Sequence, residues 1–377
     1  MPWKEASVVK LRKEFIDLAR GTDNFSLLCA NFGISRKTGY KWLERFQCNG
    51  ESGLKDLVRR PVTSPNRIGL AMEKAILEIR KQHRYWGGRK IKRRLENLGY
   101  CNVPAASTIT EVLKRNALID PIEAANHSPF NRFQHPYPND LWQMDFKGHV
   151  QCPEGRCHPL TVLDDCSRFA VALKACLNER RETVENCLIE TFRRYGLPNK
   201  IITDNGSPWG NHGNNPYTSL GIWLMRLGIL IGHSSPAHPQ TLGKDERFHR
   251  TLKAELLGES LPWRNEEVQK KFDDWRFIYN HYRPHQALNL EVPVNCYTIS
   301  NRYFPETLPA IEYGSNDIVR KVQSKGILHF QGREFRVPQA FTRYPVALRP
   351  RAQYDGIYEV YFVRQLILVI NLDDHDK

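Results

Sequence analysis

Three acidic residues stand where their carboxylates could hold divalent metal ions. Asp145 lies in the run LWQMDF, and Asp204 directly follows the run KIIT. Both runs are rich in the apolar residues of buried strands. Glu246 lies near the start of residues 236–257, where apolar residues recur every four positions, as on the buried face of a helix. Carboxylates that converge from two strands and a helix could bind hard divalent ions through oxygen.

Two cations follow Glu246 along the predicted helix. Arg250 and Lys253 stand four and seven residues after it, which places all three on one stripe, rotated away from the apolar stripe. This pattern suits a metal site that lies beside a polyanion, with Arg250 and Lys253 contacting that polyanion. The alternative is a solvated helix face with ordinary charge pairs four residues apart.

Four motifs occur in order between Gln143 and Leu288: QMDF, TDNG, SPAHPQTLGKDERFHRTLKAEL and YNHYRPHQAL. In these motifs the chain resembles the retroviral-integrase superfamily, specifically insertion-sequence transposases with an aspartate–aspartate–glutamate (DDE) core. The resemblance implies that Asp145, Asp204 and Glu246 are catalytic and bind Mg²⁺ or Mn²⁺, as two ions. The 41 residues between Asp204 and Glu246 exceed the usual family spacing. We expect the extra residues in the polar loop WGNHGNNPYT.

The family chemistry implied is cleavage of DNA at the ends of an element, followed by joining of the freed 3′-hydroxyl to target DNA. The implied partners are double-stranded terminal inverted repeats, target DNA and further copies of the chain on DNA. A cytoplasmic, nucleoid-associated bacterial protein is implied as well. Two other functions stay open: a helix-turn-helix regulator without catalysis, and a ribonuclease-H-like nuclease without strand transfer.

Other acids compete with the three chosen ones. Asp164 and Asp165 follow a predicted strand, where turn-capping acids are common. Asp245 lies about 100° around the helix from Glu246, so the two cannot both face one ion. Glu255 does not match the family motif.

A zinc site is a weaker alternative. His149, Cys152, Cys157 and His158 lack the paired ligand spacing of structural zinc sites, and a hairpin loop explains them more simply. The nine cysteines are scattered and odd in number, which favours a reduced cytosolic compartment.

Charge and length indicate a multidomain protein that binds a polyanion. The 377 residues predict two to four domains. Of the net charge of +14, +11 lies in residues 1–130, and such an excess favours DNA. An anionic membrane surface would suit the charge too, but no apolar run approaches the roughly 20 residues that span a bilayer.

Residues 1–60 predict a helix-turn-helix DNA-binding domain. A helix over Val8–Ala19 is followed by two short helices, separated by Gly33-Ile34-Ser35. Gly33 suits a tight turn and Ser35 a helix cap. The second short helix begins with polar residues that could enter a major groove. The expected DNA contacts are Arg36, Lys37, Thr38 and Lys41.

Residues 61–130 predict a second helix-turn-helix domain after a polar linker. The expected helices are Ala71–Arg84, Gly88–Leu98 and Ser107–Asn116, with Ser107 as a cap. The middle helix is strongly basic, and its expected DNA contacts are Arg89, Lys90 and Arg93. A basic solvated face is the alternative.

The remaining residues predict an α/β core and a small β domain. In residues 131–300, three sequential strands and then alternating helices and strands suit a ribonuclease-H-like catalytic core. Residues 301–377 predict five or six short strands, which we interpret as an all-β SH3-like barrel. The predicted fold class is therefore all-α helix-turn-helix units, then an α/β ribonuclease-H-like core, then a small all-β barrel.

Overall fold

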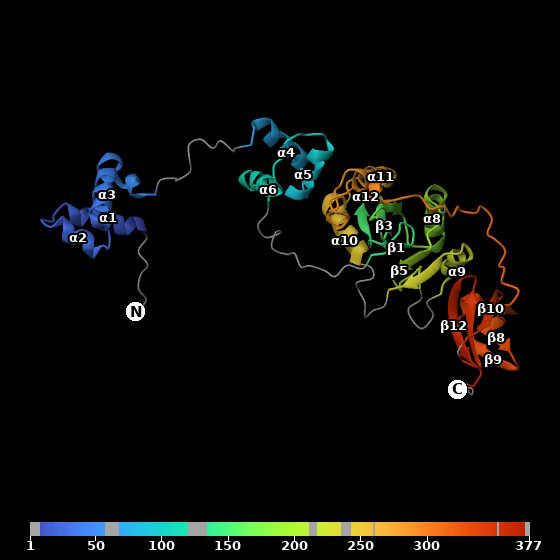
Figure 1. The fold of residues 1–377 in the computed structure, drawn as a ribbon. Helices are drawn as coiled ribbons and strands as arrows, with labels where there is room; N and C mark the ends of the chain where they lie inside the picture. Colours follow the sequence, from blue (N-terminus) through green and yellow to red (C-terminus); the bar gives the residue numbers. More distant parts are fainter. Residues whose placement is uncertain are drawn as a thin grey trace. The chain divides into compact units, whose positions relative to one another are not determined.

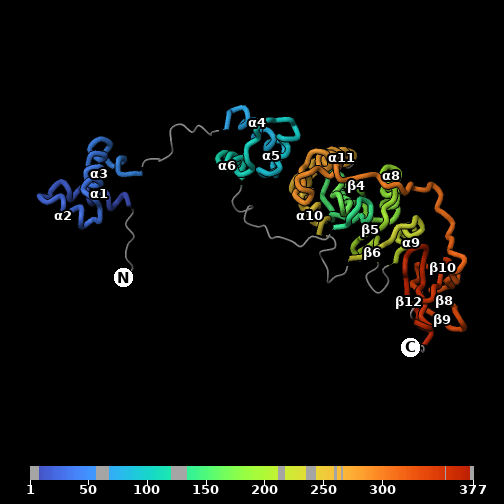
Figure 2. The backbone as a smooth tube through the Cα atoms, in the orientation of Figure 1, coloured from blue at the N-terminus to red at the C-terminus, as the bar shows by residue number. Residues whose placement is uncertain are grey.

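The computed structural model describes residues 8–56, 68–119, 134–210, 217–234, 243–258, 261–352 and 354–373. The chain divides into two compact units, Met1–Arg67 and Ile68–Lys377, which are considered separately. Figure 1 labels their helices and strands, and Figure 2 traces the same backbone. No helix in the described ranges is long and apolar enough to span a membrane.

The first unit is a helical domain of α1 (Val8–Ala19), α2 (Phe25–Asn31), α3 (Arg36–Asn49) and a 3-10 turn, Gly50–Leu54. Gly33 adopts a φ of 65° between α2 and α3. The backbone N–H of Thr38 donates to Ser35 Oγ over 3.2 Å, so Ser35 caps α3 as predicted. A Cβ atom on Gly39 would lie 2.7 Å from the sulfur of Cys29, so the two helices require glycine here.

The second unit begins with α4 (Leu70–Gln82), α5 (Gly88–Asn97) and α6 (Ala106–Arg115). Their shared core contains Ile76, Trp86, Ile91, Leu95, Ile109 and Leu113. The expected cap at Ser107 is wrong, because α6 begins one residue earlier and its N-cap is Ala105, without a side-chain hydrogen bond.

A mixed sheet lies at the centre of the second unit. Its strands are β1 (Leu141–Phe146), β2 (Val150–Cys152), β3 (Gly155–Asp164), β4 (Ala170–Cys176), β5 (Lys200–Thr203) and β6 (Leu230–His233). β1 pairs antiparallel with β3 and parallel with β5, β4 pairs antiparallel with β3, and β6 pairs parallel with β5. The hairpin loop expected around Cys152 and Cys157 is a β-hairpin, in which β2 pairs with the first residues of β3.

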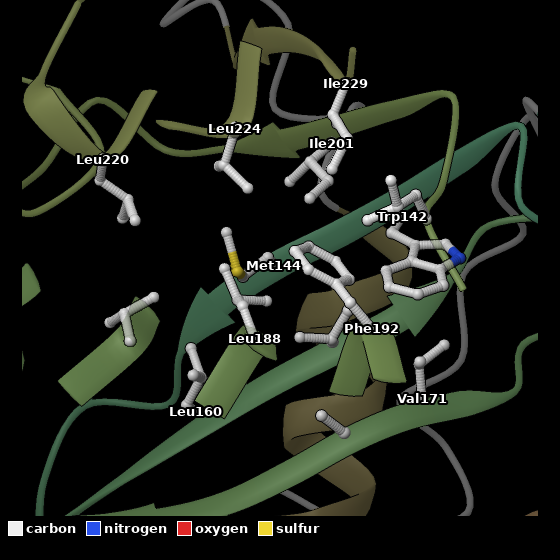
Figure 3. Packing of buried hydrophobic residues seen from close by; sticks show 14 of the residues in the cluster. Trp142, Met144, Leu160, Val171, Leu188, Phe192, Ile201, Leu220, Leu224 and Ile229 are labelled. Carbon is white, nitrogen blue, oxygen red and sulfur yellow. The ribbon is translucent and has the colours of Figure 1, made fainter. Parts of the chain in front are cut away.

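Helices cover both faces of this sheet, as in a ribonuclease-H-like core. On one face lie α8 (Arg181–Tyr195) and α9 (Ser219–Arg226), and Figure 3 shows Phe192 and Leu188 of α8 packed near Trp142 and Met144 of β1. The opposite face carries α10 (Gly243–Leu252), a π-helical turn (Lys253–Leu257) and α11 (Asn265–His281). After α11 the chain forms a 3-10 turn (Gln286–Leu288) and the short helix α12 (Pro293–Cys296). Because side chains alternate along a strand, Gln143 and Asp145 face α10.

The C-terminal residues form an all-β domain. β7 (Ile318–Lys321), β10 (Pro345–Pro350), β11 (Ile357–Phe362) and β12 (Gln365–Asn371) make an antiparallel sheet in the order β12-β11-β10-β7. β8 (Ile327–Phe330) and β9 (Arg333–Arg336) form a separate hairpin. Both sheets share one apolar core, which also contacts Ile222 and Met225 of α9. The SH3-like topology stays a prediction.

Candidate active site and metal centre

Strand register brings the first two acids together. β1 and β5 run parallel, with Gln143 opposite Ile202. Continuing that register by two residues places Asp145 beside Asp204, where β1 is ending and β5 has just ended. Parallel strands present paired side chains on the same face. The two aspartates therefore lie on neighbouring strands, as the resemblance implied, and the Asp145 carboxylate faces α10.

A tight turn holds Asp204 in place. The N–H of Gly206 donates to Asp204 Oδ1 over 3.0 Å. A Cβ atom on residue 206 would lie 3.1 Å from Asp204 Oδ2, so glycine leaves this carboxylate accessible. On the neighbouring strand, His233 Nδ1 lies 3.0 Å from the carbonyl oxygen of Asp204. The turn is thus fastened to β6.

Helix α10 presents a second pair of polar side chains to the sheet. Asp245 and His249, one turn apart, are both buried, and His249 Nε2 lies 3.5 Å from Asp245 Oδ2. His249 Nδ1 lies 3.9 Å from Asp145 Oδ2. Thr161, opposite Asp145 on β3, places its hydroxyl 2.7 Å from His249 Nε2. One ligand atom each from Asp145, Asp245 and His249 lies within 4.8 Å of the others.

Burial and mutual repulsion raise the proton affinity of the two aspartates. Burial, then the nearby Asp204 carboxylate, raises the pKa of Asp145 to about 7. Burial, then Asp145, raises the pKa of Asp245 well above its ordinary value. Burial lowers the pKa of His249 to about 3, so its imidazole is neutral. A divalent cation relieves such repulsion, and carboxylate oxygen with neutral imidazole nitrogen is a donor set that fits one.

The third acid chosen from the sequence does not belong to this cluster. Glu246 is exposed on the outer side of α10, whereas its neighbour Asp245 points inward. In the described part of the chain, Asp145 therefore meets Asp245 and His249 rather than Glu246 at ligand distance. The sequence could have indicated that Asp245 is buried. It stands three residues before Phe248 and seven before Leu252, on the buried stripe of the helix.

The competing acids have separate structural roles. Asp164 accepts from the backbone N–H of Asn139 over 2.7 Å and from Ser167, so the expected turn-capping role describes it. Asp165 instead contacts Lys244 at the start of α10. Glu255 accepts from Trp275 Nε1 and Arg283 Nε, each over 3.1 Å, and so helps to fasten α11.

The candidate zinc ligands are likewise occupied by other contacts. Cys152 and Cys157 belong to the apolar cluster beneath α10 and α11. His158 Nδ1 lies 2.8 Å from the Glu179 carboxylate. These residues help to build the β2–β3 hairpin and its packing.

The candidate DNA contacts of the first unit lie at the start of α3. Arg36, Lys37 and Lys41 are exposed, and Thr38 is half-buried beside the cap. They occupy the first two turns of the second short helix, the end that helix-turn-helix proteins insert into a major groove.

The candidate contacts on α5 divide between solvent and the catalytic core. Arg89 is exposed, whereas Arg93 makes a hydrogen-bonded ion pair with Glu291. Arg94 lies 4.4 Å above the ring of Tyr282. Burial, then Arg283, lowers the pKa of Lys90 to about 7. Helix α5 thus docks on the end of α11, and Lys90 and Arg93 face that junction, which the sequence could not indicate.

Arg250 and Lys253 are exposed on the same side of α10 as Glu246, in keeping with the predicted stripe. The regular helix ends at Leu252, however, and Lys253 opens the π-helical turn. The predicted stripe assumed 3.6 residues per turn throughout. It therefore missed the change from α-helix to π-helix between Arg250 and Lys253.

Known families match the helical units, the core and the C-terminal domain. The chain matches the Integrase core domain over residues 135–239 and, in a second family of the same description, over 227–293. Residues 317–377 match the IS481 family transposase C-terminal domain. Residues 11–61 match a Helix-turn-helix domain and 38–113 a Homeodomain-like domain.

Several curated proteins are similar to the chain. The transposase for transposon Tn552 of Staphylococcus aureus is 23% identical over 367 residues, covering 83% of this chain and 72% of that protein. An insertion element IS407 31.7 kDa protein of Burkholderia multivorans is 26% identical, covering 41% and 54%. The Pro-Pol polyprotein of Feline foamy virus is 24% identical, covering 60% and 18%. The chain thus spans about half or less of the length of several relatives.

Among solved structures, the HTLV-2 integrase catalytic core domain in complex with magnesium covers 44% of this chain and all of its own, at 14% identity and a TM-score of 0.34. A simian T-cell lymphotropic virus intasome chain covers 78% of this chain and 98% of its own, at 15% identity and a TM-score of 0.37.

The sheet and the core-domain matches show that residues 135–293 are similar to an integrase core. Among integrase-core proteins, the likeness is to transposases in particular. Three findings indicate this: the helix-turn-helix match, the IS481-type C-terminal match and the insertion-element relatives. The chain is therefore similar to insertion-sequence transposases and integrases in its core, its helix-turn-helix units and its C-terminal domain.

Proposed function

We propose that the chain is a DNA transposase that binds the terminal repeats of its element, cleaves DNA at the ends and joins the 3′-hydroxyl to target DNA. The observation that carries this proposal is the parallel register of β1 and β5, which sets Asp145 beside Asp204 under α10 of an integrase core. Terminal-repeat binding is assigned to residues 1–130, and assembly of several copies on DNA follows from the family. A bacterial nucleoid location belongs to the same proposal.

Asp145, Asp204 and Glu246 are proposed to hold two Mg²⁺ or Mn²⁺ ions. Such ions supply Lewis-acid stabilisation of the attacking and leaving oxygens of an in-line displacement at phosphorus. Glu246 is exposed in the first turn of α10, which places its carboxylate where DNA can approach. Asp245 and His249 lie behind it and hold the inner face of α10 against Thr161. The inner pair is the alternative ligand set for an ion bound at Asp145.

The remaining groups orient the DNA. Arg250 and Lys253 are proposed to contact the phosphates that flank the cleaved one, which positions the strand without reading its bases. Arg36 and Lys37 are proposed to bind end DNA through α3. In this proposal residues 1–130 bind the DNA ends and the core cleaves and joins DNA, which explains why most of the positive charge lies in residues 1–130.

A strand-transfer assay with the full chain and labelled element-end duplexes tests this function. Cleaved ends and joined products should form with Mg²⁺ or Mn²⁺ and disappear with EDTA, while circular dichroism shows an unchanged fold. A regulator would bind and do nothing further, and a nuclease would cut without joining. Joining that survives exhaustive chelation would exclude metal-dependent chemistry at these acids.

A further inference from the structure

Asp165 is a fully buried carboxylate, and two of its partners, Lys244 and Gln143, lie on the elements that build the candidate active site. Its Oδ1 accepts from the ammonium of Lys244 in a close ion pair, and from Gln143 Nε2 over 2.8 Å. Its Oδ2 accepts from the backbone N–H of His135 over 2.8 Å. The residue itself has no exposed surface. One carboxylate therefore ties together the strand that carries Asp145 and the first turn of α10.

Gln143 extends this arrangement to the backbone of α10. Its side-chain oxygen accepts from the N–H of Asp245 over 3.2 Å, while its amide nitrogen donates to Asp165. The first N–H groups of a helix lack partners within the helix, so an outside acceptor fixes where the helix begins. Gln143 lies two residues before Asp145 on the same face of β1, so the same strand bears the acceptor and the first catalytic acid.

These contacts act on the residues that immediately precede Glu246. Lys244 and Asp245 are its two chain neighbours toward the N-terminus, and both are fastened to the sheet. A rotation or a one-residue shift of α10 would break both contacts together. A buried ion pair adds little to folding stability compared with apolar packing, so its main contribution here is the geometry that it imposes.

We propose that Asp165, Lys244 and Gln143 form a clamp that sets the position and rotation of the first turn of α10, and thereby the placement of Glu246 relative to Asp145. These three are positioning residues, since they act through α10 and not on the DNA. This inference rests on the proposed function for its catalytic consequence. The structural consequence, a fixed start of α10, stands independently of it.

The experiment compares full-length variants with a more exposed ion pair elsewhere on the core. Lys244→Met removes the ammonium and keeps most of the side-chain volume, while Lys244→Arg keeps the charge. Asp165→Asn tests the other partner. Glu190→Gln serves as the control, because Glu190 pairs with Lys174 over 2.6 Å on α8, away from α10. Amide hydrogen exchange over residues 243–252, end binding, and cleavage rate at saturating DNA are measured for each.

For Lys244→Met we expect amide exchange at the start of α10 to rise at least tenfold. Cleavage and joining at saturating DNA should fall at least tenfold, and the Mg²⁺ concentration for half-maximal cleavage should rise. End-binding affinity should stay within twofold. Asp165→Asn should change amide exchange and cleavage in the same direction. The double variant should lose no more activity than the less active single variant. Lys244→Arg should recover most of the protection and rate, and Glu190→Gln should change neither.

Unchanged exchange at residues 243–252 in a folded Lys244→Met protein would overturn the clamp. So would additive losses in the double variant, which would mean that the two groups act independently. A wild-type protein that never cleaves or joins DNA would instead overturn the proposed function. The exchange measurements would still decide whether the clamp exists.

Discussion

The hydroxyl of Thr161 lies 2.7 Å from Nε2 of His249 and links the middle of β3 to the inner face of α10. The same hydroxyl lies 2.9 Å from the carbonyl oxygen of Asp145 and 3.3 Å from Asp245 Oδ1. Thr161 is fully buried. A single oxygen atom thus satisfies polar groups on both sides of the helix–sheet interface at the candidate site.

Replacement of Thr161 by valine should destabilise the protein by about 1–3 kcal/mol, because it leaves buried polar groups without a partner while keeping the side-chain volume. Urea denaturation at pH 7 measures the loss. Thr191→Val is the control, since the Thr191 hydroxyl donates to the carbonyl of Cys187 within its own helix, and should cost less than about 1 kcal/mol. Equal costs for the two variants would contradict a special role for Thr161.

Asp145→Asn, Asp204→Asn and Glu246→Gln should each lower cleavage and joining at least ~100-fold, because loss of a metal ligand costs more than the 10–100-fold typical of outer-shell partners. Folding and end binding should be retained. The measurement is the strand-transfer assay, with Asp273→Asn, a change on the exposed part of α11, as control. If Asp245→Asn were inactive while Glu246→Gln stayed active, the inner acid would be the ligand instead.

Lys253→Glu should weaken joining on every end sequence alike and flatten its dependence on salt, because Lys253 is proposed to contact a phosphate and not a base. Its melting temperature should change little, since the side chain is exposed. Joining rates across a salt series provide the test, with Lys270→Glu on α11 as the charge-matched control. A Lys253→Glu protein that joins DNA at the normal rate would show that this lysine is only solvated.

Arg36→Ala combined with Lys37→Ala should reduce affinity for element ends and lower the slope of log affinity against log salt by about 0.9 for each phosphate that the variant no longer neutralises. Both side chains are exposed at the start of α3. Fluorescence anisotropy with labelled ends at several salt concentrations measures the slope. Lys13→Ala, on the same unit but paired with Glu51, should keep the wild-type slope. An unchanged slope in the double variant would show that Arg36 and Lys37 do not contact the phosphates of the element ends.

Lys90 should make stability depend on pH in the alkaline range. Its pKa falls from 10.5 to about 7 on folding, chiefly through burial, so between these values the unfolded chain binds more protons. Stability should therefore rise from pH 7 toward pH 10 in the wild type. Lys90→Met should abolish at least about 1 kcal/mol of that rise, because a tenfold change in proton affinity corresponds to about 1.4 kcal/mol. Urea denaturation at several pH values tests this, with Lys92→Met as control.

Much of the fold could be predicted because local patterns determine it. The first helix follows from apolar spacing, and its end at Ala19 was predicted to the residue. The strands around Asp145 and Asp204 follow from short apolar runs that precede polar turns. Their adjacency was implied by the resemblance and matches the parallel pairing of β1 with β5.

What could not be predicted depends on contacts between distant segments. Which neighbour on α10 faces the sheet depends on the rotation of that helix, and Asp165 and Gln143 contribute to that rotation from other strands. The docking of α5 on α11 depends on the Arg93–Glu291 pair, whose members are 198 positions apart in the chain. We predicted that Lys90 and Arg93 contact DNA because α5 is strongly basic. The sequence does not show whether basic residues lie on a free surface or in a contact between helices.

The π-helical turn at Lys253–Leu257 has a consequence for how this helix tolerates length changes. A π turn holds one more residue than an α turn, so it acts as an inserted residue absorbed without breaking the helix. Deleting one residue here should convert the turn to α-helix, while Glu246, Phe248 and Leu252 keep their places upstream. The same deletion one turn earlier would rotate the start of α10, with Glu246, by about 100° relative to Leu252 and the residues that follow it. Length variation among related chains should therefore concentrate in this turn and avoid the stretch before it.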